Sequence, residues 1–262
     1  KNVKYLICDI TKKEKLAKKL QSNYDYVVNL GGYVDHTNKK KTYKSHFLGC
    51  KNLCEIFLKK KIISFVQIGS SAEYGKIKSP QNEITKCKPS SIHGIYGKSK
   101  LFATLYLMKL FKKKNFPCTV LRLYQVYGPQ QDYNRFIPII VRACLKNSIF
   151  PCSTGNQKRD FTHVKDVVDA ILKSFIKKKS RGQIINIGTG KVIKLKNAIE
   201  HIRRYTKGGI PKYGAIKLRK DEIINVSPNL HLSNKILNWK SKIDFKKGLN
   251  NTIKYIKKDL SV

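Results

Sequence analysis

The chain has 262 residues, 41% of them hydrophobic and 10% aromatic, which excludes a disordered composition and allows a sizeable buried core. No apolar run approaches the ~20 residues that span a bilayer, and the first residues lack a signal-peptide pattern, so we expect a cytoplasmic protein without a membrane partner. The net charge of +39 would attract nucleic acid, but only 8 of the 55 basic residues are arginine and the lysines are scattered, which favours a solvated surface over a specific nucleic-acid site.

Short apolar runs alternate with longer helical patterns through the first 190 residues. Strands are predicted over 3–8, 26–30, 64–68, 119–124 and 183–187. Helices are predicted over 12–22, 42–58, 96–114, 135–146, 164–176, 195–206 and 245–260. Alternation of this kind predicts an α/β fold with a Rossmann-like, doubly wound parallel sheet.

Seven cysteines are present, and none forms a CxxC pair. Cys50 and Cys54 lie one helical turn apart in an apolar stretch, which indicates core-facing thiols. We therefore expect reduced cysteines and no metal site.

A dinucleotide-binding sheet normally opens with a strand, a GxGxxG turn and a helix. Nothing before Asp9 has this pattern, and Gly31-Gly32 is not followed by a helix start of that kind. We expect that the chain begins after its first βαβ unit, and that this segment alone binds a dinucleotide weakly or not at all.

Tyr96 and Lys100 lie four residues apart, on one face of a predicted helix. A lysine ammonium beside a phenol favours the phenolate, so such a tyrosine can exchange a proton with a carbinol oxygen. In a chain so rich in lysine this spacing also arises by chance, and an exposed tyrosine on a basic helix is the alternative.

A serine-rich turn directly follows the predicted strand 64–68. It reads Gly69-Ser70-Ser71-Ala72-Glu73-Tyr74-Gly75, at the carboxyl edge of a parallel sheet, where ligands bind. A hydroxyl there can hydrogen-bond a reacting carbonyl. Together with the Tyr96 and Lys100 pair, the turn favours a catalytic site over an ordinary loop.

These motifs and five other segments, in order, resemble the extended short-chain dehydrogenase/reductases of the NAD-dependent epimerase/dehydratase family, which modify nucleotide sugars. The other segments that carry the resemblance are Cys8-Asp9-Ile10-Thr11, Asn29-Leu30-Gly31-Gly32, the run 121–129 and Arg159-Asp160-Phe161-Thr162-His163-Val164-Lys165-Asp166, followed by Asn186-Ile187-Gly188-Thr189-Gly190. The resemblance implies NAD or NADP as cofactor, a nucleotide-diphosphate sugar as substrate and a homodimer formed through the helices 42–58 and 96–114.

The resemblance also implies roles for individual residues. Ser70, Tyr96 and Lys100 are implied to be catalytic. The implied cofactor-binding residues are Asp9, Ile10, Leu30, Gly31, Gly32 and Tyr124, together with Tyr96 and Lys100. The implied substrate-binding residues are Ser71, Gln125, Arg159 and Arg219. For Arg159 an ion pair with Asp160 or Asp166 is the alternative, and for Arg219 an exposed loop position.

Departures from the family pattern narrow the expected activity. The family's 4,6-dehydratases carry Asp-Glu where this chain has Ser71-Ala72, which disfavours dehydration and leaves 4-epimerisation or 4-keto reduction. A 4,6-dehydratase and a non-catalytic dinucleotide-binding protein remain as alternatives. His46 replaces a usual asparagine, as a structural substitute or as part of a proton relay, and His93 is expected to be a solvent-exposed loop residue.

The motifs also predict a division of the chain. Residues 1–128 are expected to form a partial NAD(P)-binding domain that carries the catalytic residues. Residues 129–262 are expected to form mostly a substrate-binding region, with Rossmann elements returning around 164–190.

Overall fold

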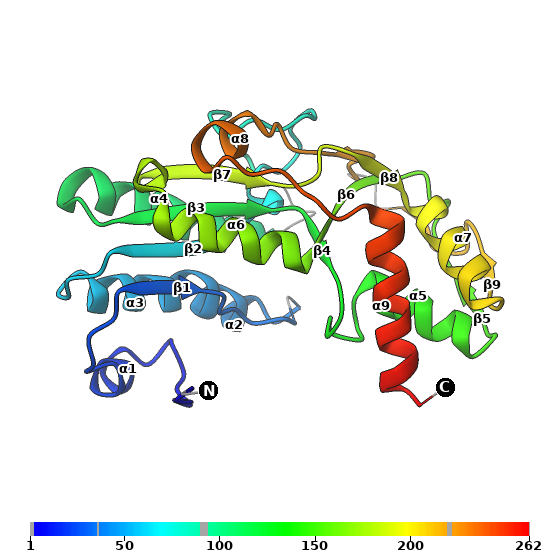
Figure 1. The fold of residues 1–262 in the computed structure, drawn as a ribbon, viewed down its shortest axis with the longest axis horizontal. Helices are drawn as coiled ribbons and strands as arrows, with labels where there is room; N and C mark the ends of the chain where they lie inside the picture. Colours follow the sequence, from blue (N-terminus) through cyan, green and yellow to red (C-terminus); the bar gives the residue numbers. More distant parts are fainter. Residues whose placement is uncertain (1–2, 36, 90–93, 219–221, 262) are drawn as a thin grey trace. The chain divides into compact units, whose positions relative to one another are not determined.

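The computed structural model describes residues 3–35, 37–89, 94–218 and 222–261 (Figure 1). Its contacts divide the chain into two compact units. Unit 1 comprises Lys1–Ile77, Thr85–Arg122 and Ile171–Ile185, and unit 2 comprises Lys78–Ile84, Leu123–Ala170 and Asn186–Val262. Each unit is described separately below.

The centre of unit 1 is a four-stranded sheet with the order β1-β2-β3-β7 (Figure 1). Its strands are β1 (Tyr26–Asn29), β2 (Ser64–Ser70), β3 (Cys118–Leu123) and β7 (Gln183–Ile187). β1 runs parallel to β2, with Tyr26 opposite Ser64 and Asn29 opposite Gln67. The predicted α/β fold with a parallel sheet is confirmed.

Helices connect these strands. They are α1 (Lys13–Lys19), α2 (Lys39–Tyr43), the π-helical turn η1 (Lys44–Leu48), α3 (Gly49–Phe57), the 3₁₀ turn η2 (Ser71–Glu73), α4 (Gly94–Lys114), α6 (Val164–Ile176), which crosses the unit boundary, and the 3₁₀ turn η3 (Lys178–Ser180). The prediction of one continuous helix over 42–58 is wrong in one respect, because the π-helical turn η1 separates α2 from α3. π-turns are rare and occur frequently at functional sites.

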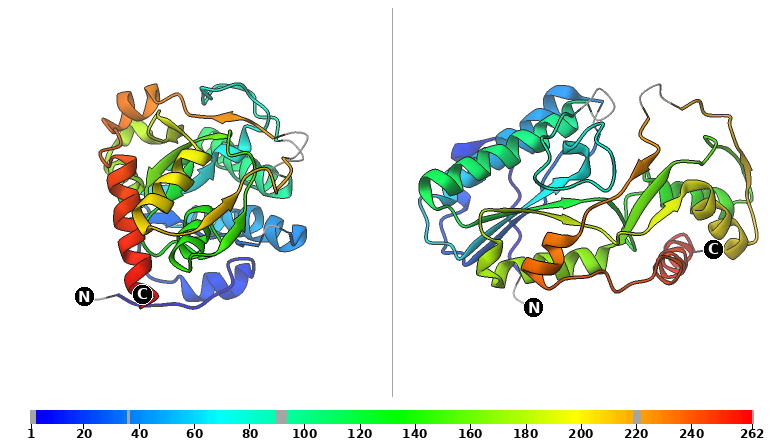
Figure 2. Two further views of the ribbon diagram at one scale, coloured as in Figure 1. Left: turned by 90° about the vertical axis from the view of Figure 1, so that its right-hand side faces the viewer. Right: turned by 90° about the horizontal axis from the view of Figure 1, so that it is seen from above.

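Apolar side chains cover both faces of the unit 1 sheet. On one face, α3 and α4 bury a cluster that contains Cys50, Cys54, Phe57, Phe65, Ala103, Leu107, Phe116, Cys118 and Val120. Cys50 and Cys54 are fully buried there, as predicted. The other face is covered by α6 (Figure 2, right). Its Phe175 packs against Tyr26 of β1, with ring centroids 5.2 Å apart.

The strand predicted over 3–8 is wrong. In the structure this segment is irregular, and Val3, Tyr5 and Ile7 are 63%, 86% and 91% exposed. Among the described strands, β1 pairs with β2 alone, and residues 3–8 form no ladder with any strand. An apolar alternating pattern does not form a strand without a partner.

Unit 2 contains smaller sheets and the carboxyl-terminal helices. Its strands are β4 (Gln125–Tyr127), β5 (Ile149–Pro151), β6 (Lys158–His163), β8 (Val192–Lys194), β9 (Ile210–Lys212) and β10 (Asn225–Val226). Its helices are α5 (Phe136–Leu145), α7 (Leu195–Thr206), α8 (His231–Leu237) and α9 (Phe245–Asp259). β6 is the central strand, parallel to β4 and β10 and antiparallel to β8.

The core of unit 2 forms where α5, α7 and α9 meet β6. It buries Ile137, Ile140, Phe161, Ile199, Ile202, Leu249, Ile253 and Ile256, among others. The spacing of the last three confirms the predicted apolar face of the final helix. Within the described residues, no helix combines the length and the hydrophobicity needed to cross a bilayer.

Candidate active site

Two strand ends carry the candidate site of unit 1. β1 ends at Asn29, directly before the Leu30-Gly31-Gly32 turn, and β2 ends at Ser70. Because β1 and β2 are parallel neighbours, their carboxyl ends lie at one edge of the sheet, where ligands bind in folds of this type. The expected positions of the turn and of Ser70 are therefore adjacent.

The Gly31-Gly32 turn is shaped by its neighbours. A Cβ added at Gly32 would lie 2.0 Å from Cε1 of His46, and one at Gly31 would lie 3.1 Å from Ile10 Cδ1. The Asn29 side chain accepts a hydrogen bond from the Gly31 amide at 3.1 Å. Glycine at position 32 is thus required because the His46 ring occupies the space that any side chain would need.

His46 connects this turn to Tyr96. It lies in η1 and is 6% exposed, and its Nε2 is 3.1 Å from the carbonyl oxygen of Tyr33. Its ring meets the Tyr96 ring edge to face, with centroids 5.0 Å apart and planes at 78°. His46 thus packs between the Gly32 turn and the Tyr96 ring.

Ser70 caps the turn that follows β2. Its Oγ accepts a hydrogen bond from the Ala72 amide at 3.2 Å, and its own amide donates to Glu73 Oε1 at 2.9 Å, which completes a capping box. Because Oγ accepts from Ala72, the hydroxyl hydrogen of Ser70 is the group available to a substrate oxygen. Ser71 is partly exposed beside it.

Tyr96 and Lys100 lie in the first two turns of α4, as predicted. Tyr96 is partly exposed, whereas Lys100 is 5% exposed. The Lys100 ammonium donates a 2.7 Å hydrogen bond to the Ile68 carbonyl, two residues before Ser70. This bond joins the helix face that carries Tyr96 and Lys100 to the end of β2, where Ser70 lies two residues further on.

Glu73 lies directly beside Ser70, and the sequence patterns predict no function for it. Its side chain is 0% exposed, and it accepts hydrogen bonds from Ser70 N, from Thr104 Oγ1 at 2.9 Å and from Arg122 Nε at 2.9 Å. We call Ser70, Glu73, Thr104 and Arg122 the Glu73 cluster. The sequence did hold one signal, because serine followed three residues later by glutamate is the capping-box pattern.

Two neighbours complete the Glu73 cluster. A Cβ at Gly69 would lie 2.6 Å from Glu73 Oε1, so the glycine leaves room for the carboxylate. The Arg122 guanidinium lies 4.5 Å from the centroid of the Tyr74 ring. Burial disfavours the charged guanidinium, but the Glu73 carboxylate, together with smaller contributions from Tyr74 and Cys87, outweighs burial, and the pKa of Arg122 lies above its ordinary value.

The segment expected at the adenine lies at the surface of unit 1. Asp9 is exposed, and its carboxylate accepts a hydrogen bond from the Thr11 amide at 2.9 Å, which lowers the pKa of Asp9. Ile10 is partly buried, and its side chain fills the space beside Gly31 and Gly49. Leu30 is 67% exposed, at the strand end.

The remaining predicted residues belong to unit 2. Tyr124 is buried and donates a hydrogen bond to Gln81 Oε1 at 2.9 Å, whereas Gln125 is exposed. Arg159 forms an ion pair with Glu222, in place of the alternative partners Asp160 and Asp166. Two positions from the sequence analysis, Arg219 and His93, lie outside the described residues.

Asp160 and Asp166 have other partners. Asp160 accepts hydrogen bonds from the amides of Thr189 and Gly190, and Asp166 from the amides of Lys242 and Ile243. Both carboxylates therefore fix backbone turns of unit 2.

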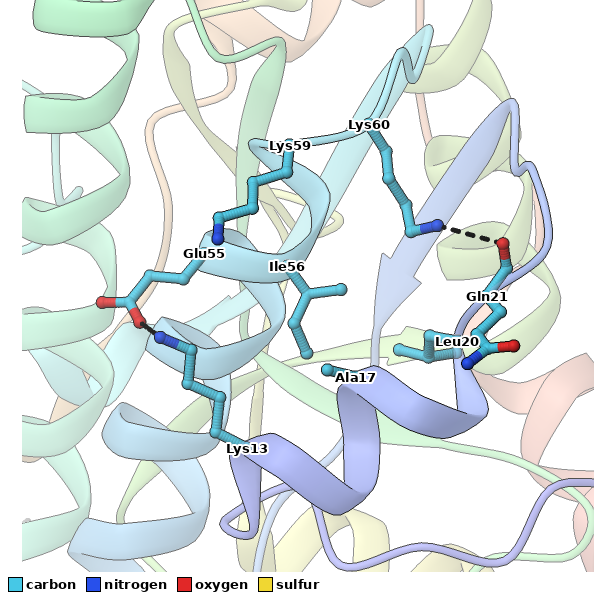
Figure 3. A pocket seen from close by; sticks show the side chains of 8 residues that line it. All are labelled: Lys13, Ala17, Leu20, Gln21, Glu55, Ile56, Lys59 and Lys60. Atoms are coloured by element: carbon cyan, nitrogen blue, oxygen red, sulfur yellow. Dashed lines mark hydrogen bonds and ion pairs between the residues drawn. The ribbon is translucent and has the colours of Figure 1, made fainter.

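A surface pocket of unit 1 is separate from these residues (Figure 3). It encloses about 350 Å³ between α1 and α3, and is lined by Lys13, Ala17, Leu20, Gln21, Glu55, Ile56, Lys59 and Lys60. Lys13 forms an ion pair with Glu55 at its rim. None of the predicted site residues lines this pocket. It therefore lacks Ser70, Tyr96 and Lys100, the predicted catalytic residues.

Comparison with known proteins identifies the family. Residues 1–188 match the NAD dependent epimerase/dehydratase family. The chain belongs to this family. Among its relatives is the CDP-abequose synthase of Salmonella muenchen, 34% identical over 131 residues, which are 49% of this chain and 44% of that protein. The chain thus spans less than half the length of that relative.

Two further comparisons cover almost the whole chain. An uncharacterized protein of Methanocaldococcus jannaschii is 30% identical over 258 residues, 95% of this chain and 77% of that protein. The crystal structure of UDP-glucose 4-epimerase from Thermotoga maritima superposes with a TM-score of 0.88 at 23% identity, covering 97% of this chain and 84% of that one. The latter likeness shows the shared fold.

Proposed function

We propose that the protein is an NAD(P)-dependent enzyme that acts at C4 of the sugar of a nucleotide-diphosphate sugar, by 4-epimerisation or 4-keto reduction. The observation that supports this most is the Lys100–Ile68 hydrogen bond, because it brings Tyr96 and Lys100 to the strand end that carries Ser70. Names of relatives, among them CDP-abequose synthase and dTDP-D-glucose 4,6-dehydratase, support the substrate class.

The residues at the strand ends fit a dinucleotide. Gly31 and Gly32 present bare backbone at the carboxyl end of β1, which lets a ribose and a nicotinamide approach closely, and Leu30 offers an exposed apolar surface beside them. We propose that Asp9 and Ile10 hold the adenine end, with Tyr124 as a further contact. When bound, the nicotinamide would exchange hydride with the sugar carbon.

The chain's own residues would handle the proton. Tyr96 would give a proton to the C4 oxygen, or take it away, while the Ser70 hydroxyl donates a hydrogen bond to the same oxygen. The Lys100 ammonium would hold the cofactor ribose. His46, packed edge to face on the Tyr96 ring, would keep the phenol oriented.

The substrate's diphosphate would be held in unit 2. Arg159 has the planar, forked donor set that suits phosphate oxygens, and we propose it as the main contact, with Arg219 as a second one. Ser71 and Gln125 would contact the sugar. Ser71-Ala72 lacks the two carboxyl groups that water elimination needs. We therefore favour 4-epimerisation or 4-keto reduction over 4,6-dehydration.

The test uses the full-length protein with a panel of CDP-, dTDP- and UDP-linked hexoses and their 4-keto forms. Replacing Tyr96→Phe removes the proton that moves, so kcat should fall about 10²- to 10⁴-fold while substrate binding persists. Tyr106→Phe is the matched control on the same helix, where the hydroxyl contacts Glu55 at 3.4 Å. Normal turnover by the Tyr96→Phe protein would refute the assignment, and cofactor binding without turnover by the wild type would favour the non-catalytic alternative.

We also propose a homodimer formed through α4 and the helices before it. Phe102 and Leu105 of α4 are 42% and 54% exposed, and Phe102 contacts Phe47 edge to face. Apolar side chains exposed on one helix are typical of a covered surface. Light scattering should show a dimer, and Leu105→Glu should convert it to a monomer; an unchanged mass would exclude this interface.

A further inference from the structure

The Glu73 cluster connects three parts of unit 1 through one carboxylate. Its Oε1 accepts from the Ser70 amide in the turn after β2, and its Oε2 accepts both from Thr104 on α4 and from Arg122 on β3. The side chains of Glu73 and Thr104 are 0% exposed. A fully buried carboxylate with this set of donors can adopt essentially one position.

Thr104 lies on the catalytic face of α4. It follows Lys100 by four residues and Tyr96 by eight, and residues at this spacing share one face of a helix. The Thr104–Glu73 and Lys100–Ile68 hydrogen bonds are therefore two links from the same face to the segment around Ser70. Two links roughly 6 Å apart along the helix determine its rotation as well as its distance from the turn.

We propose that Glu73 and Thr104 are positioning residues, which set the Ser70 hydroxyl against the Tyr96 phenol so that both reach one substrate oxygen. This inference rests on the proposed function. Misplacement of a reacting group by about 1 Å costs on the order of 10²-fold in rate, so a link of this kind acts on kcat. Gly69 supports the same arrangement, because a larger residue at this position would displace the Glu73 carboxylate.

A buried hydrogen bond can also serve stability alone, and Thr104→Val separates the two roles. The substitution keeps the shape of the side chain and removes only the hydroxyl, while Glu73 keeps Ser70 N–H and Arg122 as donors. Thr119→Val is the matched control in the same unit. Thr119 is 0% exposed, and its hydroxyl donates to the Ser180 carbonyl at 2.9 Å, away from the predicted catalytic residues.

The experiment compares Thr104→Val, Thr104→Ser and Thr119→Val in the full-length protein. We expect Thr104→Val to lower kcat about 10- to 100-fold with KM for the nucleotide sugar within about twofold, and Thr104→Ser, which retains the hydroxyl, to recover most of the rate. Thermal midpoints of the two valine variants should fall alike, with kcat unchanged in Thr119→Val. A Thr104→Val protein with kcat within about threefold of the wild type would overturn the proposal.

A second measurement does not depend on turnover. Hydrogen exchange of peptides covering residues 64–75 reports the Ser70 amide, which donates to Glu73. Exchange there should be faster in Thr104→Val than in the wild type or in Thr119→Val. A wild type without turnover on any nucleotide sugar would refute the proposed function, whereas unchanged exchange in Thr104→Val would refute the positioning link.

Discussion

Each compact unit contains an arginine paired with a glutamate, and the two pairs differ in burial. In unit 1 the side chains of Arg122 and Glu73 are 2% and 0% exposed, whereas in unit 2 those of Arg159 and Glu222 are 14% and 19% exposed. The first carboxylate has further partners in Ser70 and Thr104. A pair closed to water is a fixed part of the structure, while a pair open to water can exchange its partner.

The pKa directions of the two arginines show the same contrast. The pKa of Arg122 is raised, because Glu73 and the smaller contributions of Tyr74 and Cys87 together outweigh the cost of burial. The pKa of Arg159 is lowered, because burial outweighs the Glu222 charge and its hydrogen bond. Arg159 is thus a partly desolvated cation, and a diphosphate would bring it more negative charge than Glu222 alone.

The largest expected effect is on stability in unit 1. Glu73→Gln leaves a buried guanidinium without a counter-charge, and should lower the free energy of unfolding by about 3–5 kcal/mol. Glu222→Gln, the matched change in unit 2, should cost less, about 1–2 kcal/mol, because those side chains are partly exposed to water. Urea unfolding of both variants measures the two losses in the free energy of unfolding. Equal losses would show that burial does not distinguish the two arginine–glutamate pairs.

Removing both charges in unit 1 tests whether Arg122 and Glu73 stabilise the protein as one pair. Arg122→Met alone leaves the Glu73 carboxylate buried and uncompensated, so it should cost about 3–5 kcal/mol. In the double variant Glu73→Gln/Arg122→Met no charge is left unpaired, and most of that loss should be recovered. Losses that simply add would show that Arg122 and Glu73 act independently.

The pair in unit 2 should respond to substrate. Arg159→Lys loses the forked geometry, and should raise KM for the nucleotide sugar about tenfold, equivalent to about 1.4 kcal/mol. Glu222→Gln removes a competing anion, and should lower the same KM by a smaller factor, about two- to fivefold. Steady-state kinetics at constant ionic strength test both, and a raised KM in Glu222→Gln would show that Glu222 supports the arginine.

The smallest effect is expected at the surface pair Lys13–Glu55, whose side chains are 52% and 28% exposed. The hydrogen bond from Lys13 lowers the pKa of Glu55 below its ordinary 4.5, so the pair stabilises the protein above that pH. Its contribution is lost as the pH falls through the lowered pKa. Glu55→Gln should lower the free energy of unfolding by less than about 0.5 kcal/mol at neutral pH, and should have no effect at a pH below the lowered pKa of Glu55. Unfolding curves recorded at each of these two pH values measure the difference.

Much of unit 1 followed from local patterns in the sequence. Short apolar runs separated by helical periodicity predicted β1, β2, β3 and β7, since alternation and burial are properties of each segment by itself. The spacing of Tyr96 and Lys100 predicted a shared helix face, and Ser70 was expected at a strand end. These predictions depend on near neighbours in the chain, so the sequence was sufficient for them.

What only the tertiary structure decided depends on residues far apart in the chain. Residues 3–8 have a strand pattern but no described strand to pair with. The role of Glu73 appears only where Thr104 and Arg122, 31 and 49 positions away, meet its carboxylate. The same holds for His46 behind Gly32 and for Glu222 on Arg159. A sequence pattern indicates the structural preference of one segment. The position of a buried charge depends on the residues that compensate it, and these lie far away in the chain.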